Sequence, residues 1–218
     1  MAELVKEHGA TKLFGVLLLI FTISLIVVLA LVPSNKFQQQ METEVKALSL
    51  LLNDTRWGEV TNNVSLNYYK YYENSGLREK VDLTLTPKGD YKLKQIVKNY
   101  KGESVLQRAA TNIHIMSYQI IYRVTVIQYW IWLMLPLLFA MIYEGYTARK
   151  IRLYEPEQIS IKGSRLWTRS IVYLILISFT YLVLPNLLGQ YAPWYPVATL
   201  FLTGYAIRNT VKNYMKVA

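Results

Sequence analysis

The sequence contains no cysteine and only two histidines, His8 and His114, among its 218 residues. The absence of cysteine excludes disulfides, thiolate catalysis, cysteine-ligated zinc and iron–sulfur clusters. With so little histidine, any metal site would depend mainly on oxygen ligands. Charged residues are also scarce, at 17% of the chain against 53% hydrophobic residues, whereas soluble domains average about 25% and roughly 45–50%. This composition excludes a disordered chain, a soluble nucleic-acid-binding domain and a disulfide-stapled secreted module.

Motifs that carry enzymatic chemistry are missing as well. Neither histidine has a companion nucleophile and orienting group in a recognisable pattern, and we expect His114 to be structural. There is no Gly-x-x-x-x-Gly-Lys loop for nucleotide hydrolysis. No Asp, Glu, Lys or Arg interrupts the long apolar segments, although ion-coupled transporters usually place such groups there. We therefore expect a protein that is not an enzyme and that uses no cofactor or metal.

Four apolar segments are long enough to cross a bilayer, which takes about 20 residues of helix. They cover residues 13–32, 124–143, 170–188 and 191–207. The fourth is short and begins with two prolines, so a re-entrant segment is its alternative; a cleaved signal peptide is the alternative for the first. The expected fold is an all-α integral membrane protein with four transmembrane helices and a mostly helical periplasmic insertion between spans one and two.

The distribution of lysine and arginine predicts the orientation. The loop 144–169 holds six basic residues and the tail 208–218 is also basic, and short basic segments stay in the cytoplasm. Both termini are then cytoplasmic, and we expect the protein in the bacterial inner membrane. The resulting divisions are a head (1–12), span one (13–32), a periplasmic domain (34–122), span two (124–143), a basic loop (144–169), span three (170–188), span four (191–207) and a basic tail (208–218).

The net charge of +10 is largely explained by this topology and by attraction to anionic membrane lipids. No stripe of interleaved aromatic and basic residues is present, of the kind that binds single strands. The sequence therefore argues against direct nucleic-acid binding.

Two apolar seams at helical spacing flank the periplasmic domain. The seams predict that spans one and two extend outward as helices that pack on each other as an antiparallel stalk, or that meet copies of themselves in a homo-oligomer. Four tyrosines between residues 68 and 72 predict a small cap, and the alternation over residues 81–85 fits a short strand. The seam residues are Phe37, Met41, Val45, Leu48 and Leu52 before the cap, and Val105, Ala109, Ile113, Met116 and Ile120 after it.

The second span ends in the most distinctive stretch of the chain, residues 136–152. We expect Glu144 to lie at the membrane boundary and to pair with a nearby arginine, Arg149 or Arg152. Gly145 and Gly204 are candidates for close approach between helices, because small residues let helix backbones meet in lipid.

An arginine before a span, a proline within it, and an acidic-Gly pair followed by basic residues form a recognisable order. Here these residues are Arg123, Pro136, Glu144, Gly145, Arg149 and Arg152, followed by a third span ending at Pro185 and a tail with Lys212 and Tyr214. This order resembles the inner-membrane proteins of integrating conjugative elements and large conjugative plasmids, including the TraJ-type transfer protein. That family usually shows Asp-Gly at the position of Glu144-Gly145, and a more basic tail.

The resemblance implies a role in conjugative DNA transfer, as a non-enzymatic membrane partner of the coupling-protein ATPase of a type IV secretion apparatus. We expect the partner to be bound through Glu144, Gly145, Arg149, Lys150, Arg152 and Gly204. A self-assembling membrane scaffold and an accessory subunit of a transporter or channel are the alternatives.

Overall fold

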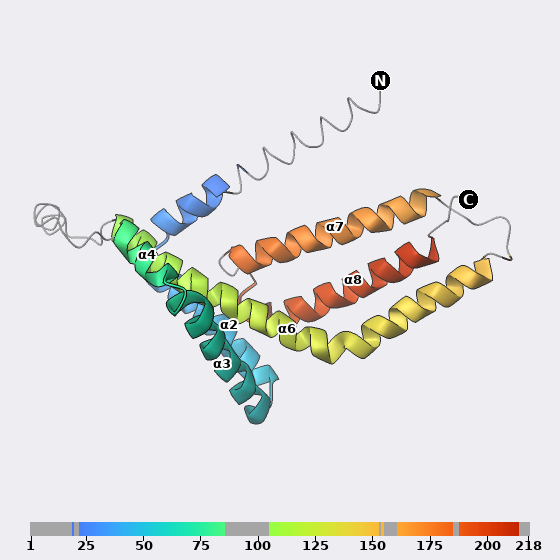
Figure 1. The fold of residues 1–218 in the computed structure, drawn as a ribbon, viewed down its shortest axis with the longest axis horizontal. Helices are drawn as coiled ribbons and strands as arrows, with labels where there is room; N and C mark the ends of the chain where they lie inside the picture. The colour runs from blue at the N-terminus through green and yellow to red at the C-terminus, as the bar shows by residue number, and fades with distance from the viewer. Residues whose placement is uncertain are drawn as a thin grey trace, which may run out of the picture. The chain divides into compact units, whose positions relative to one another are not determined.

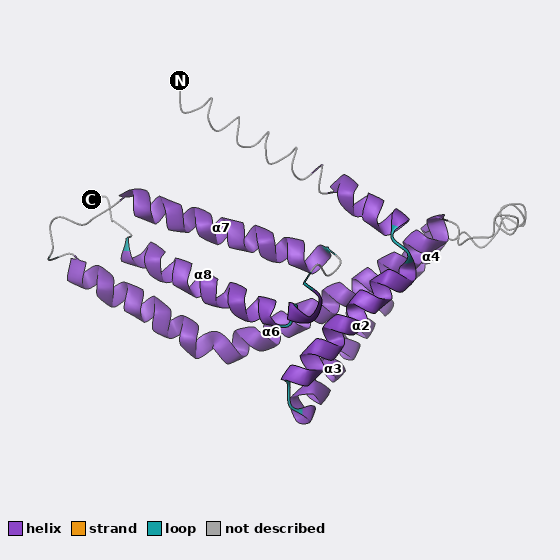
Figure 2. Ribbon diagram, turned by 180° about the vertical axis from the view of Figure 1, so that it is seen from behind, coloured by secondary structure: helices purple, strands orange, loops and turns teal. Residues whose placement is uncertain are grey.

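The structure is a computed structural model, which describes residues 19, 22–85, 105–152, 154, 161–184 and 188–213. Every regular element in this part of the chain is a helix (Figures 1 and 2). After an apolar helix over Thr22–Leu31, these elements are α2 (Ser34–Leu51), α3 (Asp54–Tyr68), the π-helical turn η1 (Tyr69–Glu73), α4 (Leu77–Leu85), α6 (Val105–Arg152), α7 (Ile161–Val183), the 3₁₀ turn η2 (Gly189–Tyr191) and α8 (Trp194–Lys212).

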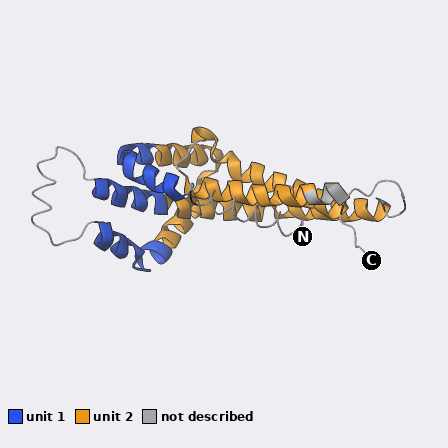
Figure 3. Cartoon of the chain, turned by 90° about the horizontal axis from the view of Figure 1, so that it is seen from above, with its two compact units in different colours: residues 1–39, 69–117 blue, residues 40–68, 118–218 orange. Residues whose placement is uncertain are grey.

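The chain forms two compact units (Figure 3). Unit 1 contains residues 1–39 and 69–117, and unit 2 contains residues 40–68 and 118–218. Helices α2 and α6 each contribute residues to both units. The expected all-helical fold is confirmed for the described part of the chain.

Among the described residues, two helices, rather than the four expected, are long and apolar enough to cross a membrane. One covers Val105–Ile151 and contains the predicted second span, and the other covers Leu166–Val183, which includes residues 170–183 of the predicted third span. The predicted first span lies partly outside the described residues, and its described part forms the shorter apolar helix Thr22–Leu31. Helix α8 is long enough, but its uncharged run from Trp194 ends at Arg208 and is rich in Trp, Tyr and Pro. The four-span topology is therefore not confirmed.

The strand expected over residues 81–85 is wrong, because these residues belong to α4. Five residues are too few to separate the two-residue repeat of a strand from the 3.6-residue repeat of a helix. In the helix, Val81 and Leu85 are four residues apart on one half-buried face, while Leu83 is 56% exposed.

Helix α6 runs through the predicted outer helix and the second span without interruption, over 48 residues. It bends in its second half (Figure 1), and it contains Pro136. Proline lacks the N–H that bonds to the preceding turn and its ring crowds the carbonyl of that turn, which bends helices. The structure thus joins the predicted outer helix and residues 124–143 in one helix, whereas the outward direction of the extension stays a prediction.

The expected antiparallel stalk is wrong, because α2 runs in the same direction as α6. Within unit 2, Glu44 contacts Gln119 and Arg123, and the residues that follow Glu44 on α2 join a core with those that follow Arg123 on α6. Helix α3 returns against both helices and completes the core, so the first seam is covered within the chain. The core consists of Leu48, Val60, Val64, Tyr122 and Val126, with Val45, Leu52, Trp57, Tyr118, Tyr129 and Trp130 packed around it.

The second predicted seam is only half-buried, and Val105 at its start is 56% exposed. The fully buried residues of this part of α6 include three polar ones, Asn112, Gln119 and Arg123. Within unit 1, the Asn112 side chain donates hydrogen bonds of 2.8 Å to the carbonyl oxygens of Leu29 and Val32. These carbonyls end the apolar helix that precedes Pro33, so the amide caps a helix end. Asn112 and Gln119 lie three residues after the seam residues Ala109 and Met116, so the face of α6 that is buried within the chain borders the predicted seam and is partly polar. The homo-oligomer alternative for this seam stays a prediction.

Candidate functional site

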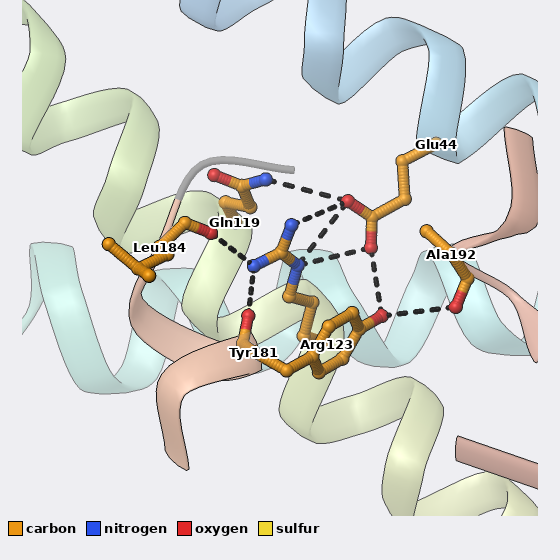
Figure 4. A network of polar contacts seen from close by, with 6 residues as sticks. All are labelled: Glu44, Gln119, Arg123, Tyr181, Leu184 and Ala192. Carbon is orange, nitrogen blue, oxygen red and sulfur yellow. Dashed lines mark hydrogen bonds and ion pairs between the residues drawn. The ribbon is translucent and has the colours of Figure 1, made fainter. Parts of the chain in front are cut away.

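A buried ion pair between Arg123 and Glu44 lies where α2, α6 and α7 meet within unit 2 (Figure 4). The guanidinium donates to the Glu44 carboxylate from Nη2 at 2.9 Å and from Nε at 3.1 and 3.3 Å. Arg123 is 1% exposed and Glu44 2% exposed. Isolated buried charges are very costly, so the burial of each of these groups depends on its pairing with the other.

Backbone and side-chain groups of α7, α6 and the turn before α8 complete this buried cluster (Figure 4). Arg123 Nη1 donates to the carbonyl oxygens of Tyr181 and, at 2.7 Å, Leu184. The Tyr181 hydroxyl donates to Glu44 at 3.1 Å and lies 3.3 Å from the Ala192 carbonyl oxygen, while Gln119 donates to Glu44 at 3.4 Å. The cluster thus joins α2, α6 and the region from the end of α7 to the turn before α8, which are far apart in sequence. The resemblance had marked Arg123 in the sequence, but nothing there identified Glu44 as its partner.

A second ion pair, between Glu144 and Arg208, links α6 to α8. The sequence predicted Arg149 or Arg152 as the partner of Glu144. The structure shows Arg208 as a partner, 64 residues further along the chain, and the Arg152 side chain lies outside the described residues. Close backbone approach explains this partner. A β-carbon placed on Gly145 would lie 2.7 Å from the Arg208 carbonyl oxygen.

Gly204 provides a second close contact between the same two helices. A β-carbon there would lie 2.7 Å from the Met141 sulfur and 2.9 Å from Leu138 Cδ2. The two glycines were predicted to let helices approach closely, and in the structure they do so between α6 and α8 of one chain. Binding of a partner through them stays a prediction, and their burial favours the intramolecular role.

The two ion pairs bound an uncharged stretch of the helices. On α6, Arg123 and Glu144 are 21 residues apart, which is about 31 Å at 1.5 Å per residue. Residues 124–143 of α6, 170–183 of α7 and 194–207 of α8 contain no Asp, Glu, Lys or Arg. This spacing is close to the roughly 30 Å hydrocarbon thickness of a bilayer.

The remaining residues of the predicted partner site surround the end of α6. Lys150 is exposed, with its ammonium 4.8 Å from the centre of the Tyr146 ring. Arg149 is half-buried and takes part in an interaction of its own. Exposed Tyr143, Tyr146 and Ile151 lie on the same stretch of helix. The described end of α6 thus carries both apolar and basic groups.

Unit 1 holds a chain of three polar side chains. The Tyr72 hydroxyl lies 2.6 Å from His114 Nδ1, and His114 Nε2 lies 2.9 Å from Asp82 Oδ1. Burial raises the pKa of Tyr72, an effect that a hydrogen bond with Ser117 partly offsets. The three residues connect η1, α4 and α6, which agrees with the structural role expected for His114. Asp82 and Tyr72 could not be assigned to it from sequence, because 32 and 42 residues separate them from His114.

Within the described residues, no three His, Asp or Glu side chains gather closely enough to hold a metal ion. A cleft of about 310 Å³ lies between α3 and α6 in unit 2. It is lined mainly by polar side chains, with one exposed tryptophan at its edge: Glu59, Val60, Asn63, Asn67, Thr125, Gln128, Tyr129 and Trp132.

A protein-family model matches residues 28–215, more than four-fifths of the chain. Its description is "IncC plasmid conjugative DNA transfer protein DtrJ-like". Among curated proteins and among solved structures, none shows a significant match.

Proposed function

Because this chain belongs to the DtrJ-like family of plasmid conjugative DNA transfer proteins, we propose that it is a non-enzymatic subunit of the inner membrane that binds the coupling-protein ATPase of its transfer apparatus. The role in plasmid conjugation is the general function that the sequence resemblance predicted. The narrower TraJ-type assignment and the coupling-protein partnership stay predictions.

The observation that carries the membrane part of the proposal is the uncharged stretch between the two ion pairs. Its length on α6, about 31 Å, suits a bilayer, and the polar clusters at its ends would lie at the two membrane surfaces. The most apolar part of α7 supports this assignment, since none of that stretch is buried within the chain. Such a surface is stable in lipid or against another membrane helix, but not in water.

The proposed orientation places Glu144 and Arg208 at the cytoplasmic surface and the Glu44–Arg123 cluster at the periplasmic surface. Basic residues at the end of α6 support this choice, because short basic segments remain in the cytoplasm. With the predicted first span, residues 13–32, also crossing the membrane, the proposal places both termini in the cytoplasm.

The proposed contact with the coupling protein combines two surfaces. The exposed apolar face of α7 offers packing for a membrane helix of the partner; it includes Val172, Tyr173, Ile175, Leu176 and Phe179. The exposed Lys150 at the end of α6 offers a cation to the cytoplasmic part of the partner. In membranes, helices associate through packing and hydrogen bonds rather than through apolar transfer from water, so the α7 face contributes packing. Lys150 contributes a charge–charge contact outside the membrane.

Co-purification from detergent, together with mating frequency, tests this proposal. We expect the wild-type chain to recover the coupling ATPase, and Lys150→Glu to reduce both its recovery and the mating frequency several-fold. Lys46→Glu is the matched control, because Lys46 is also an exposed lysine of a helix in unit 2 but is far from this end of α6 in the proposed topology. Equal recovery with all three chains would remove Lys150 from the interface, and no recovery with wild type would refute the coupling-protein partnership.

A further inference from the structure

The turn between α2 and α3 exposes apolar side chains at the free end of a helical hairpin. Helix α2 ends at Leu51 and α3 begins at Asp54. Leu48 and Leu52 face the unit 2 core, whereas Leu50 is 81% exposed and Leu51 is 37% exposed. Single exposed leucines are common on protein surfaces, but two adjacent ones at a hairpin tip require an account of their environment.

Two hydrogen bonds hold the hairpin at a defined position along α6. Arg56, in the first turn of α3, donates from Nη1 to the Tyr129 hydroxyl at 3.3 Å. Near the other end of α3, Asn67 Nδ2 donates to Thr125 Oγ1 at 3.2 Å. Both partners on α6 lie in the first residues of the uncharged run that starts at Val124. At 1.5 Å per residue, Tyr129 is only about 7.5 Å beyond Val124.

The surroundings of the hairpin have the composition of a membrane–water interface. Trp57 and Trp130 pack on the unit 2 core, and Trp132 is 70% exposed. Tryptophan and tyrosine concentrate at the level of the lipid headgroups, where one part of the ring is apolar and another is hydrated. The polar cleft between α3 and α6 lies at the same level, so polar and apolar surfaces meet there.

We propose that the α2–α3 turn rests in the outer lipid headgroup layer and inserts Leu50 and Leu51 into the bilayer surface. The inference rests on the proposed membrane-spanning arrangement and adds a second, peripheral contact with phospholipid. Lipid is the proposed contact because the turn lies beside the start of the uncharged run of α6. The proposed function already places that run in the membrane. The exposed Arg56 lies where it can also meet lipid phosphates.

Site-specific labelling tests the proposal in the full chain, reconstituted into vesicles of phosphatidylethanolamine and phosphatidylglycerol. Because the chain has no cysteine, each variant carries a single environment-sensitive fluorophore. The three variants are Leu50→Cys, Leu106→Cys as the matched control, and Leu133→Cys as the reference within the proposed span. Leu106 is another exposed leucine, on α6 and 17 residues before Arg123, and Leu133 is exposed in the middle of the uncharged run.

Quenching by lipids that carry a nitroxide near the headgroup or deep in the acyl chain reports the depth of each label. We expect shallow quenchers to reduce the fluorescence of the Leu50 label several-fold more than that of the Leu106 label, and deep quenchers to act most on the Leu133 label. Equal quenching of the Leu50 and Leu106 labels, with a quenched Leu133 label, would overturn the proposed contact and leave the membrane span intact. A Leu133 label that no lipid quenches would overturn the span, and the contact with it.

Discussion

Replacing Arg123 by methionine tests the central role of the buried ion pair. The substitution keeps much of the side-chain length but removes the guanidinium, which leaves the Glu44 carboxylate 2% exposed without a cation. Breaking a buried ion pair from one side costs about 3–5 kcal/mol, because the remaining charge stays buried and uncompensated. The carbonyl oxygens of Tyr181 and Leu184 also lose their donor, which adds about 1 kcal/mol or more.

The measurement is the free energy of unfolding in mixed detergent micelles, followed by tryptophan fluorescence. We expect Arg123→Met to lower this free energy by at least about 3 kcal/mol, which is more than a hundredfold in the folding equilibrium. The double variant Glu44→Gln/Arg123→Met should recover part of the loss. It leaves no buried charge in the cluster, and the amide oxygen that replaces the Glu44 carboxylate can still accept hydrogen bonds from Tyr181 and Gln119.

Arg78→Met is the control. Arg78 and Glu73 form an ion pair of similar length, 2.7 Å, but their side chains are 56% and 34% exposed. Exposed pairs contribute about 0–1 kcal/mol, so this variant should unfold almost as the wild type does. If Arg123→Met also stayed within about 1 kcal/mol of wild type, the buried cluster would not hold α2, α6 and α7 together, and the reasoning from its burial would be wrong.

Two further predictions concern other contacts. Gly145→Ala should destabilise the chain by about 1–3 kcal/mol, because its β-carbon would meet the Arg208 backbone. Gly58→Ala in α3, with open space around the glycine, should instead stabilise the chain by about 0.5–1 kcal/mol. Equal shifts of the thermal unfolding midpoint for the two variants would contradict this difference. Burial raises the pKa of Tyr72, so the folded state retains that proton at a pH where the unfolded state loses it. The contribution of Tyr72 to stability should therefore be constant below the unfolded pKa of about 10 and fall above it. Alkaline unfolding measurements should show a shallower fall for Tyr72→Phe, and an unchanged slope would exclude Tyr72 as a contributor.

Much of the helical architecture could be predicted from local patterns. The long apolar runs predicted the helices α6 and α7, and the continuation of α6 beyond its apolar run followed from residues at helical spacing. The prediction failed where a pattern was short, or where the helix that a segment packs against is distant in the sequence. The five-residue alternation before residue 86 was mistaken for a strand, and the direction of α2 was wrong, since one apolar seam fits either a parallel or an antiparallel neighbour.

The candidate site shows the same division between local and distant information. The sequence identified Glu144, Gly145 and Gly204 as residues of interest, but it assigned Glu144 an arginine on its own helix. The structure pairs it with Arg208 because two glycine contacts bring α6 and α8 close together. Glu44 was overlooked because it is charged, although it lies three residues after Met41 and four before Leu48, which is the spacing of the seam itself.

The sequence by itself determined the composition-dependent properties of this protein: its helices, its uncharged runs, the sign of its net charge and the absence of cysteine chemistry. These follow from local periodicity and from residue counts, which need no knowledge of which segments meet. Only the tertiary structure decided which charges are buried, because the cost of burying Arg123 depends on a carboxylate 79 residues away. Glu44 and Arg123 become neighbours only when α2 and α6 pack together.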